Sequence, residues 1–199
     1  MINVKRKKNN SLKVVFLDRD GVINEFPGDG NYVTKVQDFR FLPGALEAVR
    51  RLTEQGYIIF VISNQAGVTK GIFSKDKLDR ITRYMLKIVT RNKGKIQKVF
   101  YCIHRSDDGC DCRKPEIGLI KKALQSIHKN LRYAQESFFV GDTDSDILAG
   151  HHAGCKTIFV LSGRETRQSL RHWHRQPDFI AQDLLEASQI ITRLQKASP

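Results

Sequence analysis

The chain has 199 residues, of which 40% are hydrophobic and 28% charged, and its formal net charge is +13. This composition excludes a disordered or fibrous protein and suits one globular domain. No apolar run approaches the roughly 20 residues that span a bilayer, so we expect a cytoplasmic protein without a membrane partner. The charge is scattered, except for a basic run at 5–8, which favours a solvated basic surface over a nucleic-acid stripe. We interpret 1–12 as a flexible basic tail and 13–199 as a single domain.

The first half of the chain alternates between strand and helix patterns. The apolar run Lys13–Leu17 suits a strand that is buried on both faces. A loop rich in Gly, Asn and Asp covers 21–40, and Pro43 then predicts the first turn of a helix. A second strand is predicted at 57–62, and Ser74 is a candidate N-cap for the next helix. The apolar stripe of that helix is predicted at Leu78, Ile81, Met85 and Ile88.

The second half continues the alternation, which is typical of a parallel α/β sheet flanked by helices. Its elements are expected in the order strand 97–103, helix from about 117, strand 137–140, helix 144–152, strand 156–161, basic helical stretch 164–175, strand near Phe179 and helix from about Asp183.

Polar side chains follow three of the predicted strands. Asp18 and Asp20 follow the first, Ser63 with Asn64 and Gln65 follows the second, and Asp142 follows the fourth. Because the carboxyl ends of parallel strands meet at one edge of a sheet, we expect these groups to converge. Asp18 and Asp20 are two positions apart and point the same way, so a hard cation such as Mg²⁺ would relieve their repulsion. The alternative is a pair of aspartates that only cap turns.

Such a centre suits phosphoryl transfer. One carboxylate can attack phosphorus to form an acyl phosphate, and a second, kept protonated, can donate its proton to the leaving oxygen. Mg²⁺ and a lysine can then stabilise the charge on the equatorial oxygens.

Four motifs in order carry a resemblance to a known family. They are FLDRDGVIN at 16–24, SNQAGV at 63–68, CRKP at 112–115, and VGD at 140–142 with Asp146. This set resembles the haloacid dehalogenase (HAD) superfamily of phosphotransferases over about residues 13–161. The strings LDRDGVIN, SNQAGV and CDCRKP are similar to the subgroup that holds D-glycero-D-manno-heptose 1,7-bisphosphate 7-phosphatases and histidinol-phosphate phosphatases. The resemblance implies a Rossmann-like fold. Because the gaps between the motifs hold only a helix, a strand and the cysteine-rich segment at 102–112, we expect no cap domain.

The resemblance also implies roles for individual residues. Asp18 would be the nucleophile, and Asp20 the general acid and later the base. Ser63 and Lys114 would stabilise the transferring phosphoryl group. Mg²⁺ would be held by the Asp18 side chain, the Asp20 backbone carbonyl and Asp142, with Asp146 as support. Substrate contacts are implied for Arg113, Asn64, Gln65, Tyr32 and Val33.

Three cysteines and one histidine lie within eleven positions: Cys102, His104, Cys110 and Cys112. Cys₃His is a tetrahedral zinc set, and with no open position the metal would be structural. A disulfide is one alternative, disfavoured in the cytoplasm, and three unrelated thiols are another. The subgroup named above carries a zinc loop at this place. Cys155 lies outside the cluster and is expected to be a small buried hydrophobe.

We therefore expect a Mg²⁺-dependent phosphomonoester hydrolase with a structural Zn²⁺. Its expected substrate is a small phosphorylated metabolite, first of all the 7-phosphate of D-glycero-D-manno-heptose 1,7-bisphosphate. The alternatives are a histidinol-phosphate phosphatase and a 3′-phosphatase of nucleic-acid ends. A non-catalytic module on the same scaffold is a different class, which the intact set of Asp and Lys residues disfavours. We expect a monomer with no nucleic-acid partner.

Overall fold

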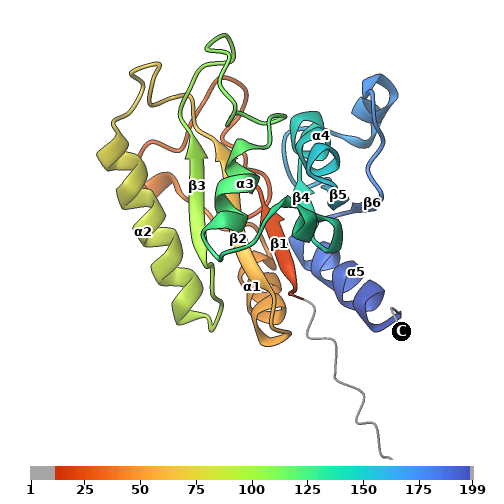
Figure 1. Cartoon of the computed structure of the whole chain (residues 1–199). Helices are drawn as coiled ribbons and strands as arrows, with labels where there is room; N and C mark the ends of the chain where they lie inside the picture. Colours follow the sequence, from red (N-terminus) through yellow and green to blue (C-terminus); the bar gives the residue numbers. More distant parts are fainter. Residues whose placement is uncertain (1–11, 198–199) are drawn as a thin grey trace, which may run out of the picture.

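The computed structural model describes residues 12–197, so residues 1–11 of the expected basic tail lie outside it. One sheet of six parallel strands has the order β3-β2-β1-β4-β5-β6 (Figure 1). The strands are β1 (Val14–Leu17), β2 (Ile58–Asn64), β3 (Lys98–Cys102), β4 (Phe138–Gly141), β5 (Lys156–Val160) and β6 (Phe179–Ala181). The α-helices are α1 (Ala45–Glu54), α2 (Lys75–Arg91), α3 (Gly118–Gln125), α4 (Asp144–Ala153) and α5 (Leu184–Ala197). Short 3₁₀ helices are η1 (Val36–Asp38), η2 (Leu131–Glu136) and η3 (Arg167–His172). This confirms the predicted α/β class and its parallel sheet.

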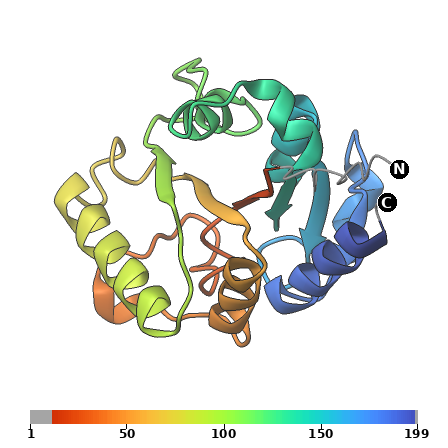
Figure 2. The ribbon, with the colours of Figure 1, turned by 60° about the horizontal axis from the view of Figure 1, so that its bottom comes forward.

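The helices cover both faces of the sheet. Figure 2 shows α1, α2 and α5 along one face and α3 and α4 along the other. In β1, Val15 and Leu17 pack on the first layer, while Val14 and Phe16 pack on the second. All four side chains are fully buried, which is why this strand is a continuous apolar run.

The strand order places a crevice at the carboxyl end of β1. The chain leaves β1 for β2 on one side, and it returns to β4 on the other side only after β3. Open α/β sheets bind ligands where the strand order reverses in this way. Between consecutive strands up to β4, the described chain holds only η1 with α1, α2, and α3 with η2. Over the described residues there is thus no cap domain above the crevice, as expected.

Three local predictions were wrong. Pro43 does not begin a helix. Gly44, with a left-handed φ of 74°, is the N-cap of α1, which begins at Ala45. In α2 the fourth buried position is Val89 and not Ile88, which is half-buried. The basic stretch 164–175 forms only the short 3₁₀ helix η3.

Ser74 caps α2 as predicted, since its side chain accepts a hydrogen bond from the Lys77 amide at 3.3 Å. Within the described part of the chain, each helix is too short or too polar to cross a bilayer.

Candidate active site and thiol cluster

Three carboxylates meet at the crevice. Asp18 directly follows β1, Asp142 directly follows β4, and Asp146 lies in the first turn of α4. The Asp18 amide donates to the Val140 carbonyl at 3.0 Å, which ties the end of β1 to β4. All three side chains are buried, and one oxygen of each lies within 4.8 Å of the others. Like charges this close need a cation between them.

Lys114 is the cation that the chain itself supplies. Its Nζ lies 2.7 Å from Asp18 Oδ1 and 2.5 Å from Asp146 Oδ1, and it also donates to the Ile62 carbonyl at 2.9 Å. Burial disfavours the charged ammonium, but the attraction of Asp146 and Asp18 outweighs this and raises the pKa of Lys114. One ammonium therefore faces three carboxylates, and the centre keeps an excess of negative charge.

The excess negative charge contributes to raised pKa values of two aspartates. Burial raises the pKa of Asp18 to about 6, with Lys114 opposing the shift and Asp146 adding to it. Burial, followed by the repulsion of Asp146 and Asp18, raises the pKa of Asp142 well above its usual range. A divalent cation among these oxygens would favour the ionised form of both.

Asp142 and its loop are held by backbone contacts. Asp146 Oδ2 accepts from the Asp142 amide at 3.1 Å, and from the amide and hydroxyl of Thr143 at 3.0 and 2.7 Å. The Arg164 amide donates to Asp142 Oδ2 at 2.7 Å. Asp142 Oδ1 is buried and has no hydrogen-bond partner among the described residues. A buried, free carboxylate oxygen beside Asp18 is the donor that a hard cation prefers.

Two glycines pack directly against the Asp142 side chain, where no Cβ would fit. A Cβ at Gly21 or Gly163 would lie 2.2 or 2.1 Å from Asp142 Oδ2, far inside van der Waals contact. Gly21 also has φ of 83°, a left-handed conformation that favours glycine. The turn after β1 and the loop after β5 can therefore both close tightly on this carboxylate.

The Asp20 carboxylate is oriented by a fully buried arginine. Arg19 donates through Nε and Nη2 to Asp20 at 2.8–3.1 Å. Asn24 Nδ2 donates to Oδ1 at 2.8 Å, and Gln65 Nε2 donates to Oδ2 at 2.7 Å. Gln65 also contacts Ser63 Oγ at 3.3 Å. Arg19, Asn24 and Gln65 all donate to Asp20, so its carboxylate is held as a hydrogen-bond acceptor.

Asn64 connects the centre to the cysteine-rich loop. Its Oδ1 accepts from the Lys114 amide at 3.1 Å, and its Nδ2 donates to the Lys114 carbonyl at 3.2 Å. Arg113 Nη1 in turn donates to the His104 carbonyl at 3.3 Å. These contacts hold the Lys114 backbone against β2 and the Arg113 side chain against the cysteine-rich loop.

A cavity of about 320 Å³ opens over these groups. Among its lining residues, those that the sequence predicted are Asp18, Asp20, Tyr32, Ser63, Asn64, Arg113, Lys114, Asp142 and Asp146. Gln65 and Val33 do not line it. Gln65 is buried beneath Asp20, and the Val33 side chain packs in the core. Their substrate contacts stay predictions.

Sequence reasoning missed Lys70 and Arg164, two cationic residues that line the cavity. Asp29 and Asn31, which also line it, come from the loop before η1. The only sequence signal for Arg164 was its place in a basic stretch four positions after the end of β5, beyond the carboxyl end of a strand.

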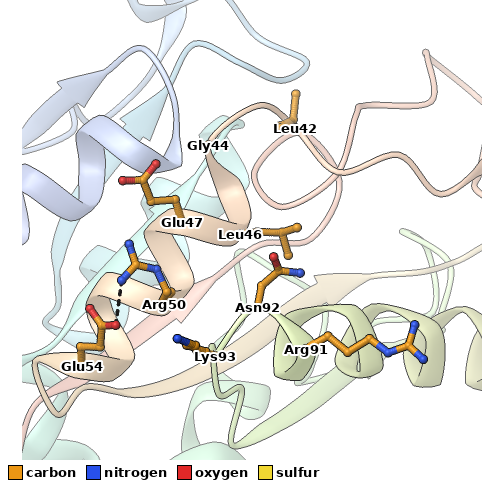
Figure 3. Close-up of a pocket in the computed structure, with 9 residues that line it drawn as sticks. All are labelled: Leu42, Gly44, Leu46, Glu47, Arg50, Glu54, Arg91, Asn92 and Lys93. Carbon is orange, nitrogen blue, oxygen red and sulfur yellow. Dashed lines mark hydrogen bonds and ion pairs between the residues drawn. The ribbon is translucent and has the colours of Figure 1, made fainter.

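A larger cavity, of about 640 Å³, lies elsewhere (Figure 3). It is an open groove between α1 and the C-terminal end of α2, and Arg50 in it pairs with Glu54 at 2.7 Å. None of the predicted site residues lines this groove. Size alone therefore does not locate the chemistry.

The predicted zinc ligands converge at the end of β3. His104 Nδ1 and the sulfurs of Cys102, Cys110 and Cys112 all lie within 4.8 Å of one another. The sulfurs are 3.2–3.6 Å apart, too far for a disulfide bond, and all cysteines are free thiols. Burial raises the pKa of Cys112 to about 12. One atom from each of four side chains suits a closed tetrahedral site.

Several known proteins are similar to this chain. A family model described as HAD-hydrolase-like matches residues 111–187. The D-glycero-α-D-manno-heptose-1,7-bisphosphate 7-phosphatase of Campylobacter jejuni is 36% identical over 150 residues, which are 75% of this chain and 83% of that protein. The D-glycero-β-D-manno-heptose-1,7-bisphosphate 7-phosphatase of Pasteurella multocida is 30% identical over 189 residues, 92% of this chain and 98% of that protein.

The chain belongs to the HAD superfamily of phosphatases. Within it, the chain falls in the subgroup predicted from LDRDGVIN, SNQAGV and CDCRKP. The solved structure of a D,D-heptose 1,7-bisphosphate phosphatase from B. bronchiseptica, complexed with magnesium and phosphate, matches with a TM-score of 0.83 and 30% identity. The match covers 94% of this HAD phosphatase and all of that chain.

Proposed function

We propose that this phosphatase removes the 7-phosphate of D-glycero-D-manno-heptose 1,7-bisphosphate through an aspartyl-phosphate intermediate. The supporting observation is the meeting of Asp18, Lys114 and Asp142 in one cavity, in a chain whose relatives are named for this reaction. A cavity of about 320 Å³ suits a small phosphorylated metabolite. We expect it to act in the cytoplasm as a monomer.

Asp18 is the proposed nucleophile. Its carboxylate attacks phosphorus, so that an Asp18 oxygen–phosphorus bond forms while the bond from phosphorus to the sugar oxygen breaks. Lys114, 2.7 Å from Asp18 Oδ1, stabilises the charge that develops on the phosphoryl oxygens. Ser63, at the end of β2, donates a hydrogen bond to the same group.

Asp20 is the proposed acid and base. It donates its proton to the leaving sugar oxygen and then takes a proton from the water that hydrolyses the aspartyl phosphate, which frees Asp18 and releases inorganic phosphate. Both oxygens of Asp20 accept hydrogen bonds in the structure, from Arg19, Asn24 and Gln65. Proton donation therefore requires Asp20 to release at least one of these contacts and turn to the cavity that it lines.

The residues around Asp18 fit a magnesium ion. The Asp18 and Asp142 side chains and the Asp20 backbone carbonyl would hold it, and the free oxygen of Asp142 supports this assignment. When bound, Mg²⁺ supplies charge stabilisation for the phosphoryl group. Asp146 is occupied by its contacts to Thr143 and Lys114, so we assign it support and not direct ligation.

We assign a structural Zn²⁺ to Cys102, His104, Cys110 and Cys112. The loop leads directly into Arg113 and Lys114, so an ordered metal site there would position both cations. Arg113, Tyr32 and Asn64, which line the cavity, are the proposed substrate contacts, and the Asn64 side chain also holds the Lys114 backbone. Gln65 and Val33, which do not line it, stay predictions.

The test is a comparison of kcat/KM among candidate substrates with Mg²⁺. The panel holds both anomers of the heptose bisphosphate, histidinol phosphate and a 3′-phosphorylated oligonucleotide. We expect the highest value for one of the heptose anomers, because relatives are named for each of them. A higher value for histidinol phosphate, or for the oligonucleotide with a steep loss in salt, would replace the proposed substrate.

A further inference from the structure

Two exposed residues of opposite charge meet at the mouth of the catalytic cavity. Arg164 Nε lies 2.7 Å from Asp29 Oδ1, and both residues line the cavity. Asp29 belongs to the loop between β1 and η1, whereas Arg164 follows β5. The Arg164 and Asp29 side chains are 52% and 74% exposed, and ion pairs as exposed as this add little to stability. The pair can therefore open readily.

The backbone of Arg164 is fixed against the catalytic centre. Its amide donates to Asp142 Oδ2 at 2.7 Å, and the preceding Gly163 leaves no room for a Cβ beside that carboxylate. The long side chain extends from this anchor to Asp29 at the mouth. The Arg164 backbone is thus anchored at Asp142, while its exposed guanidinium lies at Asp29, outside the buried group of Asp18, Asp142 and Asp146.

The charges of the cavity divide into an inner and an outer set. Inside, Asp18, Asp142 and Asp146 surround Lys114. The remaining cations that line the cavity are Lys70, Arg113 and Arg164, and Asp29 pairs with the last of these. A guanidinium offers five N–H donors in a fork that suits phosphate, and the ion pair with Asp29 involves Nε.

We propose that Arg164 binds the second phosphate of a sugar bisphosphate, and that Asp29 occupies the guanidinium until that phosphate displaces it. The inference rests on the proposed function, since it needs a substrate with two phosphates. The exchange is favourable because a phosphate dianion can accept two N–H bonds from the fork, whereas the Asp29 carboxylate is singly charged and exposed.

The test compares Arg164→Gln with the unaltered enzyme on two substrates. With the heptose bisphosphate, loss of a charged hydrogen-bond partner should lower kcat/KM about 10-fold to 100-fold, mainly through KM. With p-nitrophenyl phosphate, which has no second phosphate, the loss should be at most about 3-fold. Arg167→Gln removes the same charge from the same segment outside the cavity and should change neither value by more than about 2-fold.

Asp29→Asn tests the displacement. It should lower KM for the bisphosphate severalfold and leave the p-nitrophenyl phosphate KM nearly constant. Equal losses on both substrates in Arg164→Gln, or a raised bisphosphate KM in Asp29→Asn, would overturn the inference in favour of a loop-holding role. If the unaltered enzyme is inactive on the heptose bisphosphate, the proposed substrate is refuted instead. The ratio of kcat/KM between the unaltered enzyme and Arg164→Gln is then measured on fructose 1,6-bisphosphate, and it decides the role of Arg164.

Discussion

The carboxylate cavity and the thiol cluster both crowd like groups, but they are built differently. The cavity joins Asp18, Lys114 and Asp142 from distant parts of the chain and contains its own cation. The cluster draws its four side chains from eleven consecutive positions, and its sulfurs lie 3.2–3.6 Å apart. The cavity can therefore keep its geometry through an internal ion pair, whereas we expect the cluster to need a metal ion to relieve the crowding of its thiols.

The largest expected effect is on the reacting atom of the cavity. Asp18→Asn should lower kcat by at least about 10⁴-fold, because loss of a catalytic nucleophile removes the covalent route. The cavity should still fold, since the amide oxygen can accept from Lys114. The measurement is steady-state turnover together with circular dichroism, with Asp76→Asn on the exposed start of α2 as the matched control. Near-normal turnover in Asp18→Asn would remove it as the nucleophile.

Lys114→Met tests whether the internal ion pair maintains the cavity. It leaves Asp18 and Asp146 buried without their cation, which should cost about 3–5 kcal/mol of unfolding free energy. Turnover should fall about 10³-fold with it. Urea unfolding, with and without Mg²⁺, measures the first effect. A variant as stable as the parent would show that Lys114 is not what balances these carboxylates.

The stability of the metal-free cavity should depend on pH. The pKa of Asp18 is raised from 3.8 to about 6, so the folded state favours the protonated form. The stabilisation, about 3 kcal/mol, is complete below about pH 4 and is lost as the pH rises through about 6. Mg²⁺ binds the ionised form and should restore stability above pH 6. Thermal melts at a series of pH values, in EDTA and in Mg²⁺, measure this dependence. In EDTA, Asp18→Asn should flatten the slope of stability against pH. An unchanged slope would show that Asp18 is not the group responsible.

The smallest effect should come from the thiol cluster. Cys110→Ser should abolish stoichiometric Zn²⁺ and lower kcat/KM about 10-fold, because the loop that leads into Arg113 and Lys114, and whose His104 carbonyl accepts from Arg113, loses its fixed conformation. Cys155→Ala, outside the cluster, should retain the metal. Zn²⁺ content by elemental analysis is the readout. Full Zn²⁺ content in Cys110→Ser would mean that the metal is held elsewhere.

The sequence alone determined the features that depend on local pattern. Strand β1 was predictable because both of its faces are buried and all its residues are apolar. The thiol cluster was predictable because its ligands are close neighbours along the chain, and the Asp and Lys motifs because their spacing is typical of the superfamily.

Only the tertiary structure decided how distant groups share space and charge. It places Arg19, Asn24 and Gln65 on Asp20, pairs Lys114 with Asp146, and packs Val33 into the core. It also brings Arg164 to Asp29, 135 positions apart (164 − 29). The physical reason is that burial and electrostatic pairing depend on distances in space, and the order of the strands sets these distances. Spacing along the chain gives information only about residues that are near neighbours in sequence.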